Sequence, residues 1–286
     1  MTRSAISLAC ALLVVLTAAC GSAAETAEDH EHAEGEAEHA HGPDGEHLPD
    51  AAAAIGTRQG GTSTVLGDSV AVFVEHPALV VGALGRFAVH LTDAADYQPL
   101  TSGAVTFRFV PRDGGSPVVV TQDAPREPGI YAPAPDFARA GEYDLSVVVS
   151  GPQATDSVVV PGLRVFARAA DAPPAQAPDT TGIAYTMEQQ WQTPGFRLAR
   201  AVAADGGAGV TVPTSAILRE DDARVAYVLR TGEHFEKRTL TLGAATGGRT
   251  AVTAGIQPGE YVVSGGAAQL RRETLSPADR AHGHSH

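Results

Sequence analysis

The amino-acid sequence predicts an all-β protein with two β domains between disordered termini. Short runs rich in β-branched and aromatic residues recur about every ten residues, and several alternate apolar with polar positions. No long run with the period of an amphipathic helix interrupts them. A stretch rich in alanine and proline, residues 169–181, divides the runs into two groups. With 286 residues, the chain is long enough for two cores.

The first group of strands is expected in residues 65–168, with the first folded residues between Val65 and Ser69. Tyr143 follows a glycine at the start of an alternating strand, which is the position of a tyrosine corner. An ordinary half-buried strand tyrosine is the alternative. We expect an immunoglobulin-like β-sandwich. Its strands are predicted at 69–75, 86–91, 104–110, 116–122, 129–133, 142–150, 156–162 and 163–167.

The second group, residues 182–275, predicts a smaller β domain. Glycine and proline mark its connections at 231–235, 245–250 and 256–260. Residues 267–273 are the one expected short helix. The strands are predicted at 183–192, 196–203, 209–218, 223–230, 234–243, 250–255 and 260–266.

Residues 1–19 are typical of an export signal, with Arg3 before an apolar run too short to span a bilayer. Small residues before Cys20 resemble the cleavage site of bacterial lipoproteins, although Thr17 stands where an aliphatic residue is usual. We therefore predict that Cys20 is acylated and anchors the chain to a lipid membrane in the periplasm. An ordinary cleaved signal or an uncleaved anchor is the alternative. Loss of Cys10 with the signal would leave no partner for a disulfide.

The segments 20–64 and 276–286 are expected to be disordered and to bind metal. Ten carboxylates and no basic residue lie from Glu25 to Asp50, which accounts for most of the net charge of −13. Histidine and carboxylate suit zinc, and histidine also suits copper(II), nickel and cobalt. Ordering a flexible segment weakens binding, so we expect loose capture. An acidic spacer, or an appended histidine tail, is the alternative. The predicted ligands are His30, His32, His39, His41, His47, His282, His284 and His286.

Other classes of function have little support in the sequence. His76, His90 and His234 are isolated in or beside strands, so structural or surface positions are expected. No nucleophile with a base, paired carboxylates or phosphate-binding loop is evident, so no enzyme is predicted. The charge balance predicts no nucleic-acid partner. Trp191 is expected in a core.

The segments 212–243 and 255–273 resemble the membrane-proximal part of periplasmic adaptors, the membrane fusion proteins of resistance-nodulation-division efflux pumps. The resemblance lies in Val212-Pro213-x-Ser-Ala-Ile-Leu and in Gly255-x-x-Pro-Gly-Glu. Upstream, residues 73–105 and 125–151 resemble the extra N-terminal domain of the heavy-metal branch. Residues 183–196 resemble the strand that leads into the main body of those adaptors.

The resemblance implies heavy-metal cation efflux and contact with an inner-membrane pump or a full-length adaptor. Full adaptors carry a lipoyl-like domain, a helical hairpin and a β-barrel after that leading strand, where this chain has only residues 196–209. A shortened adaptor is therefore expected. A stand-alone periplasmic metal-binding lipoprotein, acting as a sponge or chaperone, and a structural envelope protein with an acidic spacer are the alternatives.

Overall fold

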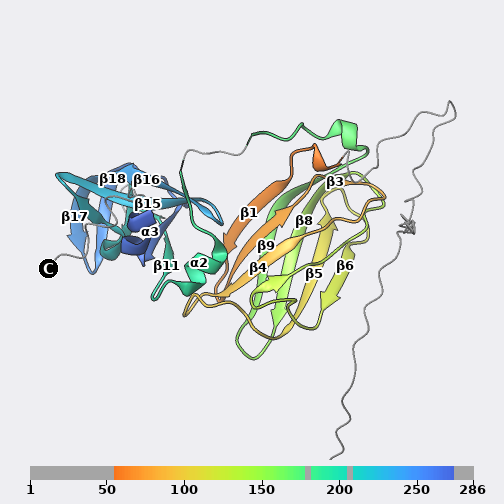
Figure 1. Ribbon diagram of the computed structural model, residues 1–286, viewed down its shortest axis with the longest axis horizontal. Helices are drawn as coiled ribbons and strands as arrows, with labels where there is room; N and C mark the ends of the chain where they lie inside the picture. The colour runs from red at the N-terminus through yellow and green to blue at the C-terminus, as the bar shows by residue number, and fades with distance from the viewer. Residues whose placement is uncertain (1–54, 178–181, 205–208, 274–286) are drawn as a thin grey trace, which may run out of the picture. The chain divides into compact units, whose positions relative to one another are not determined.

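The computed structural model describes residues 55–177, 182–204 and 209–273 (Figure 1). All of them belong to one unit of the chain, His41–His286. Strands dominate the described residues, with two short α-helices, α2 (Met187–Gln192) and α3 (Ala267–Glu273). The predicted all-β class is confirmed. Two short 3₁₀ turns are η1 (Ala169–Asp171) and η2 (Thr214–Ala216).

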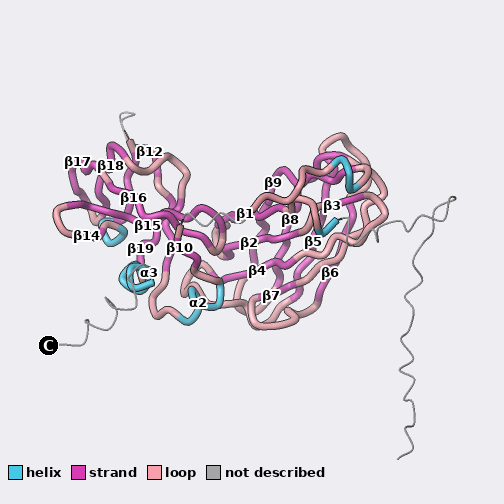
Figure 2. The backbone as a smooth tube through the Cα atoms, turned by 45° about the horizontal axis from the view of Figure 1, so that its top comes forward, coloured by secondary structure: helices cyan, strands magenta, loops and turns pink. Residues whose placement is uncertain are grey.

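The N-terminal domain is an immunoglobulin-like sandwich of two sheets (Figures 1 and 2). The strands pair antiparallel, apart from the parallel contact of β3 with β9. One sheet has, in spatial order, β1 (Gly61–Leu66), β2 (Val70–His76), β4 (Ala88–Asp93) and β7 (Ile130–Tyr131). The other has β3 (Leu79–Val80), β9 (Thr155–Phe166), β8 (Gly141–Ser150), β5 (Ala104–Pro111) and β6 (Val118–Gln122).

Alternation along the strands builds the sandwich core. In β5, Phe107 and Phe109 are fully buried, whereas Arg108 between them is exposed. In β8, Leu145 and Val147 point into the same core. The two inner faces therefore interlock, as aligned sheet packing requires.

The predicted tyrosine corner is confirmed. The Tyr143 hydroxyl donates to the Arg139 carbonyl oxygen at 2.9 Å, four residues upstream. The ring of Tyr143 also packs edge-on against Phe137, with 5.2 Å between centroids. The bond closes the approach to β8 at one end of the sandwich.

Three details of this domain differ from the sequence prediction. The strand β1 begins at Gly61, ahead of the expected start at Val65. The runs 156–162 and 163–167 are one strand, β9, because Pro161-Gly162 forms a bulge opposite Asp144, with φ of 82° at Gly162, and no turn. Part of the expected linker is also paired: Gln59 N–H donates to the Pro173 carbonyl at 2.8 Å, and Ala175 N–H to Thr57 at 2.9 Å.

The C-terminal domain consists of two further sheets. A strand of the first, β15, alternates its faces: Ala226 and Val228 lie in the core between the sheets, whereas Tyr227 faces the opposite side. The first sheet has β10 (Ile183–Ala184), β16 (His234–Thr239), β15 (Ala223–Thr231), β19 (Tyr261–Gly265) and β11 (Arg197–Arg200), with β14 (Leu218–Glu220) beside β15. The second has β12 (Val202–Ala203), β13 (Val210–Pro213), β18 (Arg249–Ala254) and β17 (Thr241–Thr246).

Three predicted strands of this domain were wrong in extent. Residues 183–192 contain the helix α2, because Thr186 and Gln189 form a reciprocal capping box that starts a helix. Residues 234–243 divide at the buried Leu240, where the chain passes from the first sheet to the second. Residues 209–218 divide into β13, the turn η2 and the start of β14. The helix predicted at 267–273 is confirmed as α3.

Candidate functional site

The predicted metal ligands and the predicted lipidation site lie outside the described residues. This applies to Cys20 and to His30, His32, His39, His41, His47, His282, His284 and His286. Within residues 55–177, 182–204 and 209–273, no group of three or more histidine, cysteine or acidic side chains is placed to hold a metal ion. The helices of these ranges are all too short or too polar to span a bilayer.

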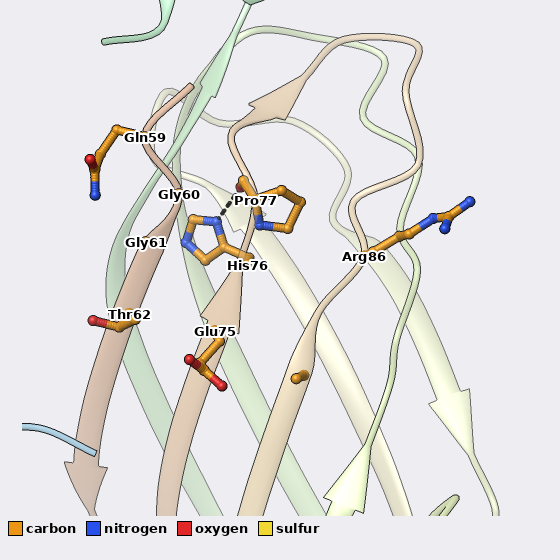
Figure 3. Close-up of a pocket in the computed structure, with 9 residues that line it drawn as sticks. Gln59, Gly60, Gly61, Thr62, Glu75, His76, Pro77 and Arg86 are labelled. Atoms are coloured by element: carbon orange, nitrogen blue, oxygen red, sulfur yellow. Dashed lines mark hydrogen bonds between the residues drawn. The ribbon is translucent and has the colours of Figure 1, made fainter. Parts of the chain in front are cut away.

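His76 lines an open groove of about 440 Å³ at one end of the sandwich (Figure 3). Its Nδ1 lies 2.7 Å from the Pro77 carbonyl oxygen, which places the proton on Nδ1. The ring packs on Phe87 at 5.1 Å, and a Cβ built on Gly61 would lie 2.4 Å from Nε2. His76 therefore closes the end of the core against the Gly61 backbone, the structural position that the sequence predicts.

Burial lowers the pKa of His76 from its usual 6.5, with the bond to Pro77 opposing the shift. The unfolded chain then binds a proton that the folded chain does not. We expect the free energy of unfolding to fall as the pH falls below 6.5, down to the folded-state pKa. His76→Gln should remove this component of the pH dependence, measured by urea unfolding between pH 5 and 8. The exposed His234→Gln should keep the wild-type slope, and equal slopes in all three proteins would contradict the assignment.

The other two described histidines, His90 and His234, have different surroundings. His90 stands on β4 between Phe73 and Trp191, with ring centroids 5.3 and 6.1 Å away, and its Nε2 is 3.5 Å from Glu75. Its Nδ1 is buried without a hydrogen-bond partner. His234 is exposed, 3.2 Å from the Thr231 hydroxyl. The described histidines are thus not brought together.

The junction of the two β domains forms around β2. Residues 70–74 of this strand are all buried, although a strand at a sandwich surface usually buries alternate residues. Val70, Val72 and Val74 face the sandwich core, whereas Ala71 packs in a second core formed with the C-terminal domain. Its neighbour Phe73 meets Gly232, where an added Cβ would lie 2.2 Å from the ring. The contact therefore requires glycine in the β15–β16 connection.

Gln190 of α2 joins the two domains through its side-chain amide, in which both the nitrogen and the oxygen form hydrogen bonds. The side chain is buried, and its Nε2 donates to the carbonyl oxygens of Tyr185 at 2.8 Å and Gly232 at 2.7 Å. Its Oε1 accepts from the Tyr97 hydroxyl at 3.2 Å. Burial raises the pKa of Tyr97, so the hydroxyl keeps the proton that it donates. The sandwich, α2 and the β15–β16 connection meet at this one group.

Trp191 is the second contact that α2 makes with the sandwich. Its Nε1 donates to the Thr92 hydroxyl at 2.9 Å, and Thr92 is fully buried. A Cβ on Gly129 would lie 2.6 Å from the indole. The side chain is therefore packed between domains and does not form an exposed ligand platform.

Loss of the Gln190 amide should destabilise the protein strongly. In Gln190→Leu, the Tyr97 hydroxyl and two carbonyl groups stay buried without their partner, so we expect a loss of about 3 kcal/mol in the free energy of unfolding. Urea denaturation measures this value. Gln192→Leu, at an exposed position on the same helix, should change it by less than about 0.5 kcal/mol. A similar loss of unfolding free energy in both variants would show that the hydrogen bonds of the Gln190 amide do not account for it.

The Gly255–Glu260 motif is a turn held by charge. Arg238 Nη1 lies 2.8 Å from one oxygen of Glu260, whose carboxylate also accepts from the Gln257 N–H at 2.7 Å. The φ angles at Gly255 and Gly259 are 107° and 90°, so any residue other than glycine would be strained at either position. Hydrogen bonds from Arg238, with Arg230 nearby, lower the pKa of Glu236. The motif is therefore explained by the fold of its own domain.

Comparison with protein families gives one match, on this domain. Residues 210–270 match the family described as CzcB C-terminal circularly permuted SH3-like domain. The C-terminal domain is SH3-like. The matched segment runs from β13 into α3 and contains both motifs on which the adaptor resemblance rests. This match supports the resemblance of the SH3-like domain to the adaptor family. No curated protein and no solved structure matches the chain.

The residues at the junction were not predicted as a group. The capping box at Thr186 and Gln189 is visible in the sequence and could have identified α2. No local signal marks Gln190 or Gly232, because their partners lie 93 and more than 150 residues away in the sandwich. Trp191 was expected in a core, and its packing agrees.

Proposed function

We propose that the protein is a periplasmic adaptor-like component of a heavy-metal cation efflux system. The observation that carries this proposal is the SH3-like domain, whose residues 210–270 match the C-terminal domain of such an adaptor. In this role the domain contacts an inner-membrane pump or a full-length adaptor. The acylated Cys20 would hold the chain at a membrane.

The junction supports an adaptor in which the two domains act together. Gln190 and Trp191 of α2 form hydrogen bonds with Tyr97 and Thr92 of the sandwich. A partner that binds the SH3-like domain therefore also positions the sandwich. The start of the sandwich at β1 is where the His-rich leader joins it.

The β12–β13 connection supports a shortened architecture. Ala204 N–H donates to the Gly209 carbonyl at 3.1 Å, so four residues close this hairpin. By resemblance, full adaptors carry their middle domains between the segments that flank this connection. Closing the sheet with four residues costs little loop entropy, which allows the domain to fold without that middle part.

Metal capture is assigned to the two His-rich termini. Calorimetric titration of the full chain with zinc, copper(II) and nickel should give weak binding of more than one ion. Alanine at the eight predicted ligand histidines should abolish the heats, whereas His234→Ala should leave them unchanged. Unchanged heats in the eightfold variant would remove the termini from the proposal.

Partner contact separates the adaptor from a stand-alone metal-binding lipoprotein. Co-purification from envelopes, with an affinity tag other than polyhistidine on the full chain, should recover an inner-membrane exporter or a full-length adaptor. An unrelated exported protein with the same tag is the control. A protein that binds metal but co-purifies with no membrane partner would favour the stand-alone function. The sequence also has no coiled-coil heptad pattern, and this absence favours the same alternative.

A further inference from the structure

The five-stranded sheet of the sandwich ends in a strand with an unprotected edge. β6 pairs with β5 on one side, and no other strand of the described ranges lies on its far side (Figures 1 and 2). Its five residues, Val-Val-Val-Thr-Gln, include no charge and no proline, and its register is unbroken. Natural sheets usually protect edges with lysine, proline, bulges or very short strands. β6 has none of these devices.

The other long edges are modified. Of the strands that end the four described sheets, only β1, β6 and β17 have five or more residues. β17 is broken by register shifts between Thr241 and Ala245. β1 is bounded at both ends, since residues 57–59 ahead of it pair with residues 173–175 and Leu66 N–H donates to the Tyr261 hydroxyl at 3.4 Å. Of these three strands, β6 has the unmodified edge.

The edge is also held ready for pairing. The Gln122 side chain accepts from the Ala132 N–H at 2.9 Å and donates to the Ala132 carbonyl at 3.3 Å. Val118 and Val120 pack on the sandwich core. A strand that is already straight and anchored loses little conformational entropy when another strand joins it.

We propose that β6 pairs antiparallel with β6 of a second copy of this chain. With Val120 opposite its own counterpart, Val119 faces Thr121 and Val118 faces Gln122 across the joint. No charged side chains oppose one another in this register, and the Val–Thr pairs match the outer face of the sheet. The Val119 side chain, 48% exposed in the single chain, becomes partly covered.

A second copy fits this edge better than an open series of strands. At the opposite side of the same sheet, β3 covers only Val165 and Phe166 of β9, and the rest of that edge carries Asp156 and the Pro161-Gly162 bulge. Pairing β6 with β6 about a two-fold axis closes after two chains, because both copies use the same edge for the contact. Val110, 40% exposed, lies on the same outer face in the neighbouring strand β5. This inference does not depend on the efflux function.

Sedimentation equilibrium of the full chain, with a chelator present, tests the proposal. We expect a concentration-dependent dimer. Lysine at both Val119 and Thr121 places like charges opposite each other twice and should weaken the dimer about tenfold or more. Both side chains point outward, so the fold should be retained, which circular dichroism checks. The matched control is lysine at both Ser157 and Val159, exposed on the same face but in β9, which two strands separate from β6.

The outcomes are decisive in both directions. Dimerisation weakened by the β6 variant and retained by the β9 variant supports the proposal. A chain that is monomeric at all concentrations, a dimer unaffected by the β6 variant, or equal weakening by both variants overturns it. A dimer that forms only without the chelator also overturns it, because the contact would then require metal.

Discussion

The side-chain amide of Gln190 satisfies three groups that come from different parts of the chain. Tyr97 belongs to the sandwich, Gly232 to the SH3-like domain, and Tyr185 precedes α2. A buried amide has two donor hydrogens and one acceptor oxygen, and here each has a partner. Such a network specifies one arrangement, because any sliding of one domain on the other would leave polar groups buried without bonds. The packing of Phe73 on Gly232 then follows from that fixed register.

One strand of each domain has buried side chains on both of its faces. β2 lies between the sandwich core and the junction core, and β15 lies between the junction core and the core of the SH3-like domain. Each strand separates two cores, so a change of register would move apolar residues from one core to the other. The two domains are therefore better described as three cores divided by two strands than as separate modules joined by a linker.

Local patterns were sufficient to predict most strands and the tyrosine corner, because period-two alternation and the Gly-Glu-Tyr segment are local features. They failed at Leu240 and Pro161-Gly162, where a strand changes sheet or bulges for reasons set by distant partners. The junction could not be predicted either, since Gln190 resembles the surface glutamines beside it in sequence. The predicted metal ligands lie in segments outside the described residues and remain a prediction.

The pairing of residues 57–59 with 173–175 has a mechanical consequence. The chain reaches the sandwich and departs from it at one place, where two backbone hydrogen bonds form the Arg58–Pro174 bridge. Tension applied along the leader reaches this short ladder before it reaches the strands of the sandwich.

 Those bonds can open one at a time, and each opening lengthens the tether while β1 keeps its pairing with β2. A pull on the leader therefore opens these bonds first, and the strands that separate the cores are loaded only afterwards.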